Sequence, residues 1–144
     1  MTTTVRAHLD EVEQAFLLWR DCVGAGRSPS PVVRSLQVRE REERLYEGFI
    51  RLRAVLSNGD LLEAFEFVVA TPDTLQTLTY RIHWQRGDGQ LQRRWDNAPH
   101  HKEVPTFPHH VHVGRAEHVE SSEPMTILKV LALVEGEIHT EDPL

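Results

Sequence analysis

Residues 49–69 read FIRLRAVLSNGDLLEAFEFVV, and this stretch decides the fold class. Two apolar runs flank Asn58-Gly59, which is a strong signal for a β-hairpin because both central residues of a type I′ turn need positive φ. A two-residue turn at this position pairs Ile50 with Phe67, Leu52 with Phe65 and Arg51 with Glu66. Apolar side chains then meet each other and opposite charges meet, so the sequence predicts two antiparallel strands in this register.

A second hairpin is expected over residues 81–96, with Asp88-Gly89 at its turn. The matching register pairs Ile82 with Trp95, Trp84 with Arg93, His83 with Arg94 and Arg81 with Asp96. Ile82 with Trp95 is an apolar pair, Trp84 with Arg93 is a cation–π pair and Arg81 with Asp96 is an ion pair. These three pairs favour the register. Together with the alternating segment around Leu36 and Val38, the two hairpins predict an antiparallel meander of four to five strands.

Helical patterns lie at both ends of the chain. Near the N-terminus, apolar residues recur at helical spacing at Leu9, Val12, Phe16, Trp19 and Val23, and Gly24 and Gly26 end the pattern. Near the C-terminus, Ser121-Ser122-Glu123-Pro124 is typical of a helix start, and Gly136 is the expected stop. We therefore expect one α+β domain over residues 1–144, with both helices packed on one face of the meander.

The composition narrows the class of protein. A net charge of −6 argues against a protein that coats DNA non-specifically. Cys22 is the single cysteine, so an internal disulfide and a cysteine metal cage are both excluded. The sequence has neither a signal-peptide pattern nor an apolar run that could span a bilayer, and we expect a cytoplasmic protein with no membrane partner.

The predicted registers divide the sheet into two faces. The face that the helices should cover carries Ile50, Leu52, Phe65, Phe67, Ile82 and Trp95. The opposite face carries Arg51, Arg53, Glu66, Arg81, His83, Arg94 and Asp96. A solvated face with cross-strand ion pairs is one interpretation, and an anion-binding platform is the other, because arginine exceeds carboxylate there while the whole chain is acidic.

Six of the nine histidines lie between Tyr80 and Gly114. Residues 109–114, HHVHVG, are expected to form a short strand with His110 and His112 on one face and Val111 and Val113 pointing inward. Histidine gives and takes protons near neutral pH and is also the commonest metal ligand. The segment is therefore a candidate site for chemistry, and two chemistries fit it.

In the first chemistry, two histidines act as general base and general acid in phosphodiester cleavage, and arginines stabilise the charge on phosphorus. This chemistry needs no metal. In the second, His110 and His112 chelate a metal such as zinc, with His100, His101 or Asp96 as a third ligand.

Four short words in this region carry a resemblance to a known family. They are HWQ at 83–85, RRWDNAPHH at 93–101, TFPHHVHVG at 106–114 and SEP at 122–124. In this order and at close spacing they resemble the TumE-like toxin family of prokaryotic toxin–antitoxin systems, over residues 80–134. The residues that carry the resemblance are His83, Trp84, Trp95, Asp96, Asn97, Pro99, His100, His101, Phe107, Pro108, His109, His110, His112 and Gly114.

The resemblance implies a small cytoplasmic toxin encoded beside a DNA-binding antitoxin, with toxicity that most often comes from RNA cleavage or another block of translation. The leading hypothesis is thus a type II toxin that cleaves RNA without a cofactor. The predicted catalytic residues are His110, His112, His101 and Asp96. The predicted substrate-binding residues are Arg81, His83, Arg94, Asn97, His100 and His109.

Two alternatives to this hypothesis stay open. The first is a metal-dependent hydrolase with zinc on His110 and His112. The second is a non-catalytic module that forms a homodimer or docks the antitoxin, with structural histidines.

Overall fold

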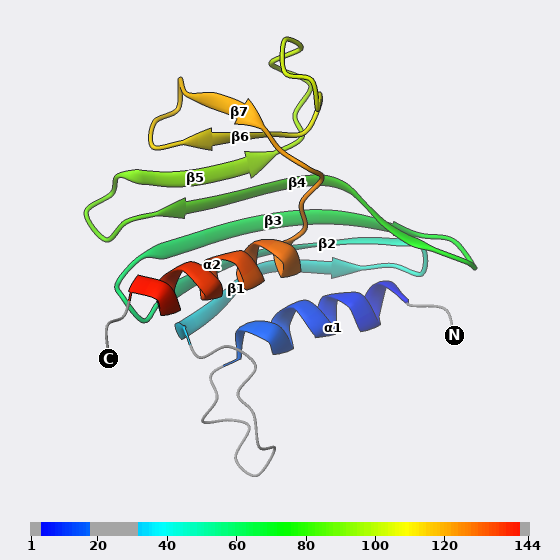
Figure 1. The fold of residues 1–144 in the computed structure, drawn as a ribbon. Helices are drawn as coiled ribbons and strands as arrows, with labels where there is room; N and C mark the ends of the chain where they lie inside the picture. The colour runs from blue at the N-terminus through cyan, green and yellow to red at the C-terminus, as the bar shows by residue number, and fades with distance from the viewer. Residues whose placement is uncertain (1–3, 18–31, 142–144) are drawn as a thin grey trace.

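A computed structural model describes residues 4–17 and 32–141 of the chain. In these residues, seven strands form one antiparallel sheet in the order of the sequence, and one helix lies at each end of the chain (Figure 1). The elements are α1 Val5–Phe16, β1 Val33–Glu43, β2 Glu47–Leu56, β3 Leu61–Ala70, β4 Leu75–Gln85, β5 Leu91–Asp96, β6 His110–Val113, β7 Val119–Ser121 and α2 Ile127–Glu141. The α+β class is confirmed. The expected four to five strands are too few, in part because β7 is too short to leave a period-two pattern.

Both helices lie on the same side of the sheet, where the apolar core is found (Figure 1). Their apolar stripes supply the buried residues Leu9, Val12, Phe16, Ile127, Val130 and Val134. The sheet supplies Ile50, Leu52, Leu62, Ile82, Trp84 and Trp95 to the same cluster. Thr4 caps α1 by accepting a hydrogen bond from Ala7 N at 3.0 Å. The expected continuation of this helix to Trp19 and Val23, with its stop at Gly24, lies outside the described residues.

The predicted register of the first hairpin is wrong by one residue. Gly59, with φ of +92°, occupies the left-handed position of a three-residue loop, and Leu56 N donates to Asp60 O. The pairs are therefore Phe49 with Phe67, Ile50 with Glu66 and Arg51 with Phe65. Since a slip of one residue reverses the face of every side chain on one strand, Phe65 and Phe67 lie on the face away from the helices.

The same slip carries Glu66 into the core, where it is fully buried. Its Oε1 accepts a hydrogen bond from Thr77 Oγ1 at 2.5 Å and lies 3.4 Å from His8 Nε2 of α1. A buried carboxylate is costly unless it has partners, and here Thr77 satisfies only Oε1, because Glu66 Oε2 and His8 Nε2 have no hydrogen-bond partner among the described residues.

The second hairpin has the predicted pairs, although its turn differs. Gly89, also at φ +92°, again takes the left-handed position of a three-residue loop, in which Arg86 N donates to Gln90 O. A register shift between Trp84 and Gln85 then restores the predicted alignment of Ile82 with Trp95. Two irregularities cancel, and Arg81, His83, Arg94 and Asp96 share one face as expected.

The C-terminal helix starts later and ends later than predicted. Ser121 belongs to β7, and α2 begins at Ile127 after Thr126, whose Oγ1 accepts from Lys129 N at 3.2 Å. The helix continues through Gly136 to Glu141, because a single glycine lowers helix stability without ending the helix. Arg93 of β5 ties the helix to the sheet through an ion pair with Glu137.

Candidate functional site

Two rows of paired residues cross the face of the sheet away from the helices. Directly opposed residues in antiparallel strands point to the same face, so each row lines up side chains from one strand to the next. One row runs Glu40, Arg51, Phe65, Arg81, Asp96 and His110 from β1 to β6. The neighbouring row runs Gln37, Arg53, Glu63, His83, Arg94 and His112. Both rows reach a histidine of β6, which pairs in turn with a residue of β7.

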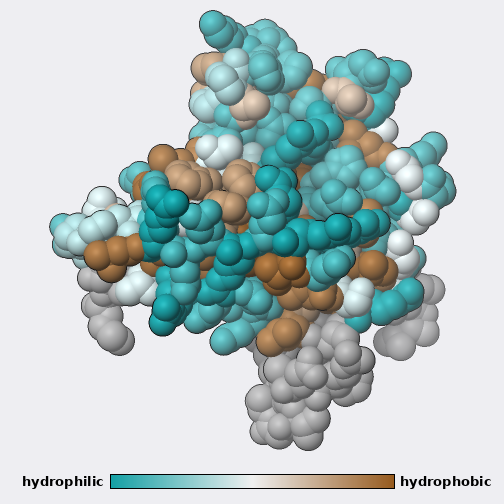
Figure 2. All heavy atoms as spheres, turned by 180° about the vertical axis from the view of Figure 1, so that it is seen from behind, coloured by the Kyte–Doolittle hydropathy of each residue, from teal (hydrophilic) through white to brown (hydrophobic). Residues whose placement is uncertain are grey.

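A hollow of about 740 Å³ lies over these rows, and we call it the arginine hollow. It is lined by Arg39, Glu40, Arg51, Leu52, Arg53, Glu63, Ala64, Phe65, Arg81, His83, Gln85 and Arg94. Seen from behind, this side of the molecule carries many hydrophilic side chains with hydrophobic ones between them (Figure 2). Five arginines face two glutamates in the lining, so the hollow is basic on a chain that is acidic as a whole.

The ion pairs of the hollow leave part of this positive charge unbalanced. Arg51 lies 3.3 Å from Glu40, and Arg53 lies 3.9 Å from Glu63. Among the described residues, Arg39 and Arg81 are exposed and form no ion pair. These two guanidinium groups are the ones that an incoming anion can reach without displacing a carboxylate.

Next to the hollow, Asp96 faces two histidines of β6. Its Oδ1 lies 3.0 Å from His110 Nε2, and its Oδ2 lies 3.5 Å from His112 Nε2. Arg94 Nε lies 3.7 Å from the same Oδ2 and has no hydrogen-bond partner among the described residues. We call Asp96 together with His101, His110 and His112 the histidine cluster.

Backbone carbonyls fix the tautomers of the two β6 histidines. His110 Nδ1 donates to Pro108 O at 2.9 Å, and His112 Nδ1 donates to Ala116 O at 2.7 Å. In the neutral rings, Nε2 is then a lone pair that faces the Asp96 carboxylate, which is an arrangement of acceptor against acceptor. A cation between these groups would relieve the repulsion.

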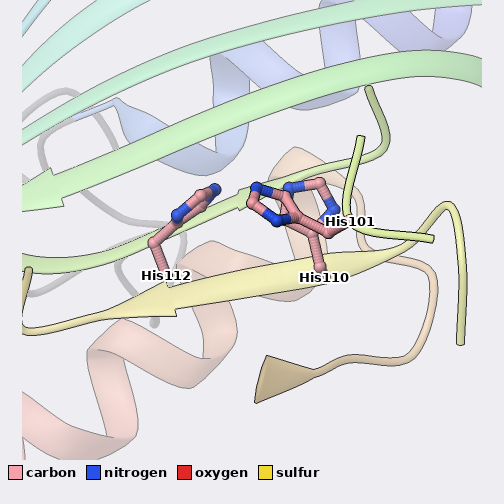
Figure 3. Close-up of side chains that lie close together, drawn as sticks. All are labelled: His101, His110 and His112. Carbon is pink, nitrogen blue, oxygen red and sulfur yellow. The ribbon is translucent and has the colours of Figure 1, made fainter. Parts of the chain in front are cut away.

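His101 covers the two rings from the segment between β5 and β6. Its φ is +57°, and its ring lies 4.9 Å from that of His110 and 5.5 Å from that of His112 (Figure 3). Its Nδ1 lies 3.3 Å from Glu103 Oε1. The His101 side chain is 33% exposed, whereas those of His110 and His112 are 2% and 6% exposed. The solvent-exposed strand position expected for His110 is therefore wrong, and solvent reaches the cluster chiefly at His101.

Burial changes the proton affinity of three groups in and beside the site. It lowers the pKa of His112 from its ordinary value, against the opposing hydrogen bond to Ala116 O, and the charge of Arg94 lowers it further. It also lowers the pKa of His109. Burial raises the pKa of Tyr80, whose hydroxyl lies 2.9 Å from His109 Nδ1, to about 12. His112 is thus biased toward the neutral form that a general base or a metal ligand requires.

The histidine cluster also has the donor set of a metal site. One ring nitrogen from each of His101, His110 and His112 lies within 4.8 Å of the other two. Each ring has its Nδ1 against an oxygen of Pro108, Ala116 or Glu103, which is how metal-binding histidines are commonly oriented. Three imidazoles and a nearby carboxylate fit Zn²⁺. The imidazoles would bind the metal through nitrogen, and Asp96 or water would take the fourth position.

The structure brings together most, but not all, of the predicted site residues. His101, His110, His112, Asp96, Arg94, His83 and Arg81 lie on or beside the same face. Asn97 instead joins β4 to β5, since it accepts from Tyr80 N and donates to Leu78 O. His100 is exposed with its ring 6.5 Å from that of His101, and His109 stacks on Tyr80, away from the hollow.

Three arginines of the lining were not among the predicted site residues. Arg51 and Arg53 had been placed on this face without a role, and Arg39 had not been placed at all. Phe65 was expected in the core. The signal that could have found it is the alternative three-residue reading of the Ser57-Asn58-Gly59 loop, which moves every side chain of β3 to the other face.

None of the helices in the described residues is long and apolar enough to cross a membrane. Comparison with curated proteins gives no match, and comparison with solved structures gives none either. The family model of the toxin TumE matches residues 24–141, a range that contains the whole sheet, the arginine hollow and the histidine cluster. Since this match covers most of the chain, the protein belongs to the TumE toxin family.

Proposed function

We propose that this toxin cleaves RNA, with the phosphate backbone bound in the arginine hollow and the scissile phosphate at the histidine cluster. The observation that carries the proposal is the continuity of the two cross-strand rows, which lead across the sheet from arginine to histidine without a break. Arg81 is the direct neighbour of Asp96 in one row, and Arg94 is the direct neighbour of His112 in the other. The arginines that we propose to bind phosphate therefore lie one or two strands away from the histidines that we propose to transfer protons.

The reaction needs one base and one acid. The base takes the proton of the 2′-hydroxyl, the 2′-oxygen attacks phosphorus, and the P–O5′ bond breaks. The acid gives a proton to the leaving O5′, so the products carry a 2′,3′-cyclic phosphate and a 5′-hydroxyl. We assign proton transfer to His110 with His101 or His112. Asp96 orients the pair, and the arginines stabilise the charge on phosphorus. His101 is the outer member because it is the most exposed of the three.

The test is cleavage of a single-stranded RNA by the purified protein in the presence of a chelator. His101→Ala should lower the rate by at least about 100-fold, because a general acid or base contributes that much. His100→Ala is the matched control, since it removes an exposed imidazole next to the cluster and should leave the rate unchanged. Equal rates for the two variants, or no cleavage by the unaltered protein with and without metals, would contradict the proposal.

A second candidate is a metal-dependent hydrolase, which the convergence of three histidine nitrogens favours. In that case His101, His110 and His112 would hold Zn²⁺, whose chemistry would be to lower the pKa of a bound water. Elemental analysis of protein purified without chelator decides between the candidates, together with the response to a 2′-O-methyl RNA. Acid–base catalysis by the 2′-hydroxyl fails on this strand, whereas attack by water continues.

We also propose that a cognate DNA-binding antitoxin neutralises the protein in the cell. The family identity supports a toxin role, and toxins of this kind need a partner that holds them inactive. Expression without the partner should slow growth, and His101→Ala should relieve this effect while His100→Ala does not. If both variants stay as toxic as the unaltered protein, toxicity does not depend on the histidine cluster.

A further inference from the structure

An aromatic side chain lies in the middle of the arginine hollow. Phe65 of β3 is half-buried in the lining, and in its row it lies between Arg51 and Arg81. The guanidinium carbon of Arg51 is 4.7 Å from the centre of the Phe65 ring, and the ring of Phe49 is 5.8 Å away at an angle of 43°. Both contacts come from β2, the strand on one side of β3.

A second aromatic pair extends this feature. Phe49 and Phe67 are direct partners in β2 and β3, and both line a smaller hollow of about 210 Å³. A stripe of three phenylalanines therefore lies on the sheet face that the helices leave uncovered. An isolated surface phenylalanine needs no explanation, but aromatic rings among arginines in a hollow are the composition of sites that bind single-stranded nucleic acid.

The distance from Phe65 to the histidine cluster follows from the number of strands between them. From Phe65 the row passes Arg81 and Asp96 to His110, which is three strand spacings, or about 14 Å. A strand with one base on Phe65 would meet Arg81 with its backbone before it reaches the cluster. A duplex cannot use the ring in this way, because its bases are already stacked on each other.

We propose that the arginine hollow binds a single strand of RNA with one base stacked on Phe65, a few nucleotides from the scissile phosphate. The proposal rests on the proposed function for the choice of RNA, and it adds the strandedness of the substrate and a residue that recognises it. Arg39 and Arg81 contact phosphates on the two sides of the stacked base, since both line the hollow and lack a carboxylate partner among the described residues.

The experiment measures the affinity of a 2′-O-methyl RNA strand, which binds but does not undergo attack by a 2′-hydroxyl. Phe65→Ala should weaken binding about five- to 150-fold, which is the effect of losing one stacked base. Phe65→Tyr keeps the ring and should keep the affinity. Tyr46→Ala is the control, because it removes a 60% exposed aromatic ring that lies outside both hollows.

Strands with one abasic site separate stacking from a general effect on the fold. At the position that stacks on Phe65, the abasic strand should bind the unaltered protein and Phe65→Ala equally well, while at other positions the variant stays weaker. Three results overturn the inference. Phe65→Ala weakens binding equally for every abasic strand, it weakens binding for none of them, or the unaltered protein binds a duplex as tightly as the single strand.

These outcomes are distinct from a failure of the proposed function. If a base stacks on Phe65 but the RNA is not cleaved, the protein has a site for single-stranded RNA and its toxicity does not come from cleavage of that RNA. If the protein cleaves RNA and Phe65→Ala binds RNA as tightly as the unaltered protein, the proposed function is retained and the stacking site is rejected.

Discussion

At the scale of single residues, the histidine cluster depends on Asp96. This carboxylate contacts both β6 histidines and also accepts a hydrogen bond from Ala98 N at 3.0 Å. The sequence was sufficient to place Asp96, His110 and His112 on one face, because the period of two in a strand is a local property. The burial of His110 could not be predicted in this way, since it depends on how the segment carrying His101 folds back over β6.

Tyr80 provides a test of the environment behind the cluster. Burial raises its pKa to about 12, above the ordinary value of about 10, so the folded state favours the neutral phenol. The resulting stability is fully present below about pH 10 and is lost as the pH rises from there toward 12.

We expect Tyr80→Phe to be less stable than the unaltered protein at pH 7, because it loses the contact with His109 Nδ1. Its free energy of unfolding should fall less steeply above about pH 10. Urea unfolding between pH 7 and 11 measures both effects, and parallel curves for the two proteins would show that Tyr80 ionises as freely in the folded as in the unfolded chain.

At the scale of elements, the two hairpin loops decide which side chains line the hollow. Both loops contain a glycine at φ +92°, and in both the sequence suggests a two-residue turn where the chain forms a three-residue loop. An Asn-Gly or Asp-Gly pair does not distinguish these two possibilities, because both need a residue with positive φ. Only in the second hairpin does a further irregularity restore the predicted pairs. The meander and the face that carries the arginines could therefore be predicted from the sequence, whereas the face that carries Phe65 could not.

Two glycine substitutions should shift stability in opposite directions. Gly89→Ala should destabilise the fold by about 1–2 kcal/mol, because a Cβ is disfavoured at left-handed φ although the space around it is open. Gly136→Ala should stabilise the fold by about 0.5–1 kcal/mol, because this residue is inside α2 with nothing within 4 Å of an added Cβ. Urea midpoints give both values, and a stabilising Gly89→Ala would mean that the loop lacks the described turn.

At the scale of the whole molecule, the protein separates a core-bearing face from a basic face. The helices, Trp84, Trp95 and the buried Glu66 lie on one side, and the arginine hollow lies on the other. Trp95 was expected on the core face, and both Trp95 and Trp84 are buried there. Arg94 is more constrained than its predicted solvent-facing position suggested, since it is partly buried beside Asp96, so Arg81 is the cleaner probe of the hollow.

Arg81→Ala should reduce the salt dependence of RNA affinity by about 0.7 in log–log slope, as expected for the loss of one phosphate contact on a single strand. Its melting temperature should stay close to that of the unaltered protein, because Arg81 is exposed and makes no ion pair among the described residues. Arg86→Ala is the matched control, an exposed arginine in the β4–β5 turn outside the hollow. Identical slopes for the two variants would show that RNA does not use this face.

The unbroken strand order from β1 to β7 also determines when the site is completed during synthesis. Each strand pairs with the next one along the chain, so a hairpin can close as soon as its second half has left the ribosome, without waiting for a distant partner. The basic strands β1 to β5 emerge before β6 with its two histidines, and α2, which closes the core, follows them. A growing chain therefore has the strands of the arginine hollow before it has its histidine cluster.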